Sequence, residues 1–441
     1  MVAVVFLLFN YIITYAAEKE YKSKINPVSV FTVLVSISLF LHEMKLIEYD
    51  DITAKAFFIL LIGESIYVAG CFLGKKRRIL FSKNNNPIVY ESSESNEACD
   101  SLLAKAIIVL SAISAIAILS GFILLLIDYD YSIIRILRSG DAIYAAHVTG
   151  KKKYLFIPYL SSFATNSLVL SGILLKRSGF KKRMIIPIFL EIMISLMTGS
   201  RYVIVLGALI FISSVLITQS RRGGTPSLQK KRQTGKHSKL SIVFFLFVLF
   251  LVFRSITKAR SNWITINEYV NPFMANIMSK FGGGIYKVYT YFASPVGVLS
   301  AFLENPYYSY GRDSFSFVFN FMKRFGIVIV GQMEGFDTNY YIPIASNTGT
   351  FLKNMIADFG LLSPFVVFAW GIIVSQSYQN AKEEQTVCNL SICSILMAIA
   401  SFCFFSWYLT DGGMWISIIV AIATGKYIDK KVYKCSKQRK C

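Results

Sequence analysis

Long apolar runs recur along this chain from one end to the other, and short charged stretches separate them. A run of about 20 apolar residues is long enough for a helix to cross a bilayer, whereas a soluble core has no use for many such runs. The pattern predicts an all-α polytopic membrane protein with about eleven transmembrane helices. The predicted spans are residues 2–17, 28–42, 53–74, 103–127, 154–175, 184–199, 202–219, 240–256, 351–377, 388–408 and 413–425.

The spans divide the chain into three parts. Residues 1–256 hold helices 1–8, residues 257–350 form one large extracytoplasmic loop, and residues 351–441 hold helices 9–11 and a basic cytoplasmic tail. Because the loop is rich in Tyr and Phe, it is unlike a disordered segment. Its stretches 273–281 and 284–302 are amphipathic, which predicts interfacial or re-entrant helices.

Lys and Arg gather in alternate connections between the predicted spans, notably residues 75–78, 176–183 and 221–239. Such residues hold a loop on the cytoplasmic side of a membrane. The N-terminus is therefore predicted to be external and the basic C-terminal tail cytoplasmic. The expected location is the inner membrane of a bacterium, with many crossings.

Composition agrees with a membrane domain, since 54% of the residues are hydrophobic. The net charge of +21 could suggest nucleic acid, but the basic residues lie where the positive-inside rule needs them, so no nucleic-acid partner is expected. The seven cysteines form no C-x-x-C pair, and neither zinc nor a disulfide is predicted.

Arg201 stands in a tight turn, Thr198-Gly199-Ser200-Arg201, between two apolar runs. An arginine at this depth is costly, so its side chain either snorkels to the interface or meets an anion. A guanidinium can bind a phosphate group through two hydrogen bonds. Arg254, Lys258 and Arg260 at the outer end of the eighth span are either interfacial anchors or part of a pyrophosphate site.

Arg312 and Asp313 follow a Tyr-rich turn in the large loop. A charge pair in a loop is commonly solvated, but aromatic faces beside charged groups are also what a sugar-binding groove needs. The aromatic candidates for sugar binding are Trp263, Tyr291, Tyr308, Tyr310 and Tyr340.

Several outer residues could serve as a general base, and spacing alone does not choose among them. They are His147, Glu268, Asp313, Glu334 and Asp337. Asp128 and Asp130 form a weak Asp-x-Asp signal for a divalent ion, and no metal or other cofactor is predicted. Glu64 and Glu191 are intramembrane carboxyl groups that either relay protons or are paired structurally. There is no Walker loop, G-x-S-x-G or H-E-x-x-H motif.

Three short motifs stand out: Thr198-Gly199-Ser200-Arg201, Tyr291 with Pro295, and Asn347 and Thr350 followed by Asp358-Phe359-Gly360. Together they resemble the motifs of one known family, the Wzy-type O-antigen and capsule repeat-unit polymerases, which are related to the O-antigen ligases. The plan of many spans with one large outer loop late in the chain is similar to theirs. A second Gly usual in the last motif is absent, since Ser363 stands near its place.

The resemblance implies a metal-independent glycosyltransferase that polymerises oligosaccharide repeat units carried on undecaprenyl pyrophosphate. The product would be O-antigen or capsular polysaccharide, made on the outer face of the inner membrane. It also implies membrane lipid, a flippase and a chain-length regulator of the same pathway as partners. Arg201, Arg254, Lys258, Arg260 and Arg312 would hold the pyrophosphate, and a carboxylate or His147 would take the acceptor proton.

Three alternatives stay open. An O-antigen ligase would perform the same transfer to a different acceptor. A secondary transporter or flippase for lipid-linked sugars would place charged sites near the midplane, in related halves. A structural scaffold in a polysaccharide assembly would leave polymer length independent of Arg201.

Overall fold

The structure, a computed structural model, describes residues 2–76, 93–148, 151–152, 154–155, 157–219, 269–282, 284–326 and 340–438. Most of these residues are helical, and their one sheet pairs two strands of two residues each. Three helical segments are long and apolar enough to cross a membrane: Ala54–Lys76, Asn96–Asp128 and Phe351–Glu384. The all-α class and the membrane character predicted from the apolar runs agree with these helices.

The chain forms two compact units. Unit 1 comprises residues 1–80, 261–376 and 399–412, and unit 2 comprises residues 81–260, 377–398 and 413–441. The predicted division at residues 256 and 350 is a division along the chain, whereas each compact unit gathers three separate stretches.

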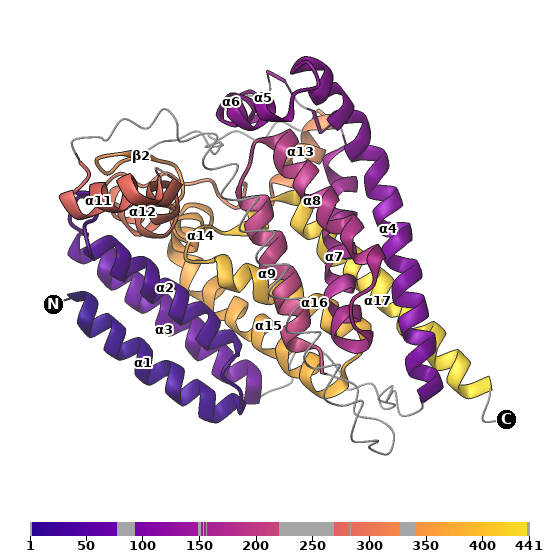
Figure 1. Cartoon of the computed structure of the whole chain (residues 1–441). Coiled ribbons are helices and arrows are strands. Elements are labelled where there is room, and N and C mark those ends of the chain that lie inside the picture. The colour runs from indigo at the N-terminus through magenta and orange to yellow at the C-terminus, as the bar shows by residue number, and fades with distance from the viewer. Residues whose placement is uncertain are drawn as a thin grey trace. The chain divides into compact units, whose positions relative to one another are not determined.

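Unit 1 begins with three apolar helices that lie side by side (Figure 1). Asn26 starts the second of them, because its side chain accepts from the backbone N–H groups of Val28 at 3.0 Å and Ser29 at 2.9 Å. The elements of unit 1 are α1 (Val2–Tyr21), α2 (Pro27–Glu43), α3 (Ala54–Lys76), α11 (Pro272–Phe281), α12 (Gly284–Glu304), α13 (Ser316–Arg324), β1 (Tyr340–Tyr341), β2 (Ala345–Ser346), α14 (Phe351–Phe359), η2 (Gly360–Leu362), the first part of α15 (Ser363–Glu384), the end of α16 (Val387–Phe402) and η3 (Tyr408–Thr410).

Glycines let α3 and α15 approach closely. A Cβ on Gly70 would lie 2.2 Å from the carbonyl oxygen of Phe368, and a Cβ on Gly371 would lie 2.3 Å from the carbonyl oxygen of Tyr67. Gly74 meets the backbone of Ile372 in the same way. Gly70 and Gly74 form a Gly-x-x-x-Gly pair, which membrane helices use for close packing.

Helix α12 packs on α2 and carries Pro295 within it. Proline removes one backbone hydrogen bond of a helix. Two side chains of α2 lie at carbonyl groups of α12 just before Pro295. Ser38 donates to Phe292 O at 2.6 Å, and His42 Nδ1 lies 2.9 Å from Ala293 O. Helices α11 and α12 lie at the two stretches predicted to be amphipathic, and Gly282, with φ 85°, ends α11.

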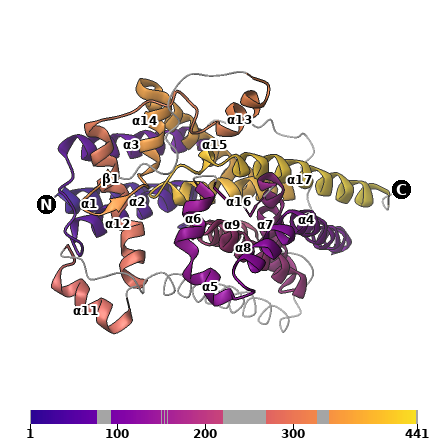
Figure 2. The ribbon, with the colours of Figure 1, turned by 90° about the horizontal axis from the view of Figure 1, so that it is seen from above.

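Unit 2 is built around two long helices that run side by side, α4 and α7 (Figure 2). Gly172 lets α7 approach α9, because its added Cβ would lie 2.9 Å from Phe211 O. The elements of unit 2 are α4 (Ser93–Asp128), α5 (Ile133–Arg138), α6 (Gly140–Val148), α7 (Pro158–Ser178), η1 (Lys182–Met184), α8 (Ile185–Thr198), α9 (Tyr202–Ile217), the end of α15, most of α16 and nearly all of α17 (Gly412–Gln438).

Each predicted span within the described residues contains a helix, but in three spans the helix is interrupted or has different ends. The segment predicted at 351–377 is interrupted at Gly360, whose φ of 50° a continuous helix cannot use. The segment at 154–175 becomes helical only from Pro158, and helix α16 stops at Phe402 rather than near residue 408. The segment at 240–256 lies outside the described residues.

Candidate functional site

The turn predicted to carry Arg201 joins α8 to α9 in unit 2. Gly199 ends α8 in the left-handed conformation, with φ 64°, and Thr198 Oγ1 accepts from the N–H of Ser200 at 3.3 Å. Ser195 donates to the carbonyl oxygen of Ser200 at 2.7 Å. These bonds hold the backbone of a sharp turn, so Arg201 takes a defined position at the start of α9.

A glycine is required at position 199 for a second reason. A Cβ there would lie 2.5 Å from Gly140 O and 2.6 Å from Tyr144 N, both in the first turns of α6. Helix α6 therefore sits directly against the Arg201 turn. This contact brings Asp141 to Arg201, with Asp141 Oδ1 3.6 Å from Arg201 Nη2.

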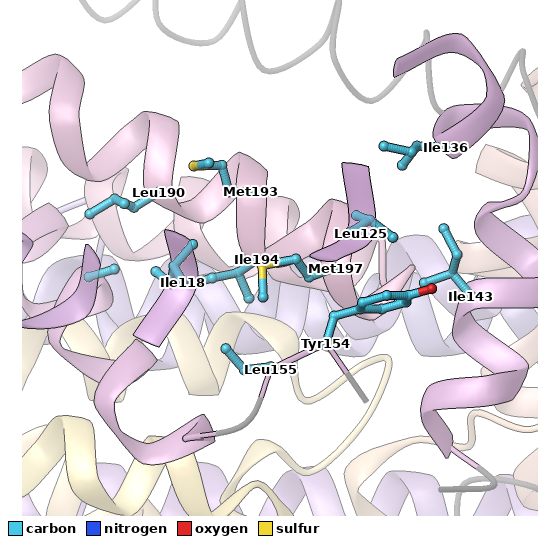
Figure 3. Close-up of a cluster of buried hydrophobic side chains, with 11 residues drawn as sticks. Ile118, Leu125, Ile136, Ile143, Tyr154, Leu155, Leu190, Met193, Ile194 and Met197 are labelled. Atoms are coloured by element: carbon cyan, nitrogen blue, oxygen red, sulfur yellow. The ribbon is translucent and has the colours of Figure 1, made fainter. Parts of the chain in front are cut away.

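A buried apolar cluster supports this arrangement (Figure 3). Ile136 of α5 and Ile143 of α6 pack with side chains of α4 and α8, among them Leu125 and Met197. Close van der Waals packing of such side chains holds helices together in a membrane. The cluster fixes the short helices α5 and α6 on the end of α8, next to residue 201.

Arg201 is only 6% exposed, so its side chain does not snorkel into solvent. Its Nε is buried and has no hydrogen-bond partner in the described part of the chain. Asp141, in contrast, is 70% exposed and only partly compensates the cation. Burying a guanidinium group costs free energy when one of its N–H donors has no acceptor. A bound anion would accept from that donor and offset the cost.

The Arg312 loop, residues 307–314 of unit 1, is held by one carboxylate, that of Asp358 at the end of α14. Its two oxygens accept from four donors of the loop: Ser309 Oγ at 2.5 Å, Asp313 N at 3.1 Å, and Ser314 N and Oγ at 2.8 and 2.5 Å. Trp407 adds a bond from its Nε1 to Ser314 Oγ at 3.0 Å. The Asp-Phe-Gly motif thus has a structural task, since Asp358 fixes the backbone of the loop.

Arg312 is 5% exposed, although a charge pair in a loop is commonly solvated. Its guanidinium makes no ion pair or hydrogen bond with any residue that the structure describes. Arg312 is therefore a second buried cation whose guanidinium N–H groups make no bond to a described residue. Like Arg201 in its own unit, it has the properties of an anion-binding group.

Asp313 lies beside Arg312 in the chain and accepts from the hydroxyl of Tyr307 at 3.2 Å. Burial raises the pKa of Asp313 to about 6, and the charge of Asp358 acts in the same direction. The Tyr307 hydroxyl and the Lys353 ammonium oppose this rise in the pKa. A carboxyl group that titrates near neutral pH can take a proton from a hydroxyl group.

Lys353 of α14 is a charged residue of this site that the sequence interpretation did not single out. It is 7% exposed, and its Nζ lies 4.7 Å from the ring centre of Tyr340 and 5.8 Å from that of Tyr307. A signal was present, since a lone cation inside a predicted span is a candidate functional residue. Thr350 at the start of α14 has a buried Oγ1 without a partner in the described residues.

The tyrosines predicted to bind sugar have different surroundings in unit 1. Tyr340 lies against Lys353, and Tyr291 stacks on Phe405 with ring centres 5.1 Å apart. Tyr308 and Tyr310 of the Arg312 loop are exposed, with ring centres 6.3 Å apart. The last two rings offer accessible apolar faces next to a buried cation and a carboxyl group.

Other predicted residues fall elsewhere. His147 lies in α6, the helix that carries Asp141. Each carboxylate of the Asp-x-Asp pair has its own cation beside it, since Asp128 pairs with Lys152 and Asp130 with Arg135. The remaining candidates lie outside the described residues: Arg254, Lys258, Arg260, Trp263, Glu268, Glu334 and Asp337.

The two carboxyl groups predicted to lie within the membrane have side-chain partners. Glu64 Oε2 accepts from Asn10 Nδ2 at 3.1 Å, and Glu191 accepts from Thr165 at 3.0 Å. These contacts fit a structural role for both residues.

The chain matches no protein-family model, no curated protein and no solved structure.

Proposed function

We propose that this chain is a membrane glycosyltransferase that polymerises oligosaccharide repeat units carried on undecaprenyl pyrophosphate. It would act as a multi-pass protein of the bacterial inner membrane and make O-antigen or capsular polysaccharide. The observation that supports this most is a pair of buried arginines: Arg201 in unit 2, whose Nε has no partner in the described residues, and Arg312 in unit 1, whose guanidinium bonds to no described residue. Such groups are suited to a diphosphate.

The chemistry needs a base as well as cations. In the transfer, a hydroxyl oxygen of the acceptor sugar attacks the anomeric carbon of the donor chain. The bond from that carbon to the lipid diphosphate breaks, and the diphosphate leaves with the bonding electrons. Arg312 would stabilise the charge that develops on the leaving oxygen.

Asp313 is the general base in this proposal, because its pKa of about 6 leaves it ionised at neutral pH and still able to accept a proton. Tyr307 would hold the Asp313 carboxylate through its hydroxyl. The exposed faces of Tyr308 and Tyr310 would stack on sugar rings. Two lipid-linked molecules take part, and Arg201 would bind the diphosphate of one of them.

The test is reconstitution of the full chain in vesicles with a synthetic undecaprenyl-pyrophosphate repeat unit. The wild type should produce a ladder of lengthened products, and Arg201→Ala and Arg312→Ala should each lose it. Arg135→Ala is the matched control, because this exposed arginine is already paired with Asp130. A ladder of normal length from both site variants would refute the proposal.

Other outcomes of this experiment would identify the alternative functions. Glycan found on lipid A rather than on the polyprenyl carrier would indicate a ligase. Movement of the lipid-linked sugar across the vesicle membrane without polymer growth would indicate a transporter.

A further inference from the structure

An open pocket of about 550 Å³ lies in unit 2, far along α4 from the Arg201 turn. The first turns of α4 form one wall, with Glu97, Asp100, Ser101 and Lys105. The connection that follows α7 forms another, with Lys181 and Arg183. None of these residues belongs to the proposed transfer site.

The charges around the pocket do not balance. The carboxylate of Asp100 is buried and already compensated, because Arg177 Nε donates to it at 3.0 Å. Arg177 is further fixed by a bond from Nη2 to Asn96 Oδ1 at 2.8 Å. This leaves the carboxylate of Glu97 against three cations, Lys105, Lys181 and Arg183.

Those three cations form no ion pair within the described residues. Like charges that face one pocket repel each other, and an anion placed between them removes that repulsion. A phosphate group suits the pocket, since ammonium and guanidinium groups both donate charge-assisted hydrogen bonds to its oxygens.

The surroundings of the pocket are apolar. Ile108, one turn beyond Lys105, is exposed, and so are Ile185 and Phe189, which follow Arg183. Exposed apolar side chains near a charged pocket are what a molecule with a polar head and hydrocarbon tails requires. A free phosphate ion would have no use for them.

The depth of the pocket agrees with a lipid headgroup. The apolar segment Asn96–Asp128 has 33 residues. At 1.5 Å per residue it is roughly 50 Å long, whereas the hydrocarbon core of a bilayer is about 30 Å thick. Its first turns therefore extend into the headgroup layer. The basic connection 176–183 is predicted to face the cytoplasm, where anionic lipids attract Lys and Arg.

We propose that this pocket binds the phosphate headgroup of an anionic phospholipid, with the acyl chains lying along Ile108, Ile185 and Phe189. The simpler explanation is that Lys105, Lys181 and Arg183 only contribute to the positive charge of the cytoplasmic side. That explanation predicts that removing any three cytoplasmic cations weakens lipid binding equally. A variant that lacks three other cations is therefore the control.

The experiment measures lipid binding to the purified full chain by native mass spectrometry, with phosphatidylglycerol and phosphatidylcholine as probes. The pocket variant is Lys105→Gln, Lys181→Gln and Arg183→Gln together. The control variant is Lys426→Gln, Lys430→Gln and Lys434→Gln on α17, which removes the same charge from exposed positions.

We expect the pocket variant to lose about a hundredfold in phosphatidylglycerol binding, since each cation near an anionic headgroup contributes roughly a factor of five. Binding to the control variant, and phosphatidylcholine binding to both, should stay within about twofold. Lys105→Glu alone should weaken phosphatidylglycerol binding as well. Because Lys105 is exposed, this second variant keeps the fold intact.

Two outcomes overturn the proposal. Equal losses of phosphatidylglycerol binding in the pocket and control variants would show that only the overall charge matters. Displacement of the lipid by soluble glycerol phosphate at a similar concentration would show a site for a free phosphate group.

Discussion

The carboxylate of Asp358 binds Ser314 twice, accepting from its backbone N–H at 2.8 Å and from its hydroxyl at 2.5 Å. These residues belong to different segments of unit 1, and their contact determines the course of the Arg312 loop. The orientation of a buried arginine and a carboxyl group in that loop therefore depends on one side chain of α14.

Replacing Asp358 with Ala should release the loop. Four donors would lose their acceptor, and each buried donor left without a partner costs ~1–3 kcal/mol. We expect faster hydrogen exchange of the backbone N–H groups of Asp313 and Ser314 and loss of transfer activity. Asp358→Asn keeps one accepting oxygen and should give an intermediate effect. Unchanged exchange at these two positions in Asp358→Ala would contradict the assigned role.

The pH dependence of transfer should report the ionisation of Asp313. With a pKa of about 6, the base is protonated in acid, so activity should rise as the pH passes through about 6 and then level off. Tyr307→Phe removes a hydrogen bond that lowers this pKa, so the rise should move to higher pH. Tyr308→Phe, which alters an exposed ring, should leave the profile in place. An identical profile for Tyr307→Phe would argue against Asp313 as the base.

The ionisation of Asp313 should also make the stability of the folded state depend on pH. Its folded pKa of about 6 lies above the ordinary value of 3.8, so the folded state binds the proton more tightly than the unfolded state does. Its contribution to stability is complete below about 4 and decreases as the pH rises to about 6. Asp313→Asn should remove this part of the dependence of unfolding on pH, measured by thermal unfolding across that range.

Arg201→Ala should separate activity from stability. We expect a loss of about 10²–10³ in transfer rate, as for other groups that stabilise developing charge. The melting temperature should change little, because Asp141 is exposed and such a pair contributes at most about 1 kcal/mol. Arg201→Lys keeps the charge without the forked donors and should recover only part of the rate. A variant that unfolds instead would show that Arg201 is mainly structural.

Gly199→Ala tests the contact between the Arg201 turn and α6. Its Cβ would collide with Gly140 O, so α6 and Asp141 must move away. We expect both the melting temperature and the transfer rate to fall. Gly179→Ala is the matched control, since Gly179 also has a positive φ but open space around it. It should show only the strain, on the order of 1–3 kcal/mol, and keep its activity. Full activity of Gly199→Ala would show that this contact is dispensable.

Local pattern predicted the helices well because a long apolar run leaves the backbone few alternatives in a bilayer. Helix α3 at Ala54–Lys76 nearly coincides with the segment predicted at 53–74. The interruption at Gly360 was harder, since its cause is the turn at the end of α14 rather than a loss of hydrophobicity.

The site was predictable only in part. Arg201 and Asp358 could be named from motifs, and Arg312 from the Tyr-rich turn before it. Their burial and partners depend on contacts between distant segments. Nothing near position 201 in the chain indicates Asp141, which reaches it only because Gly199 admits α6. Two further features could have been noticed in the sequence. Lys353 is a cation within an apolar stretch, and Gly70 and Gly74 have the spacing of a known helix-packing motif.

The glycine contact between α3 and α15 has a consequence for biogenesis. Helix α3 leaves the ribosome early, but the backbone against which Gly70 packs belongs to residues near Gly371. At ~5–20 residues per second, synthesis of the intervening chain takes on the order of tens of seconds. During that interval the face of α3 that carries Gly70 and Gly74 has no α15 to pack against, so we expect a chain truncated before α15 to be less stable in the membrane.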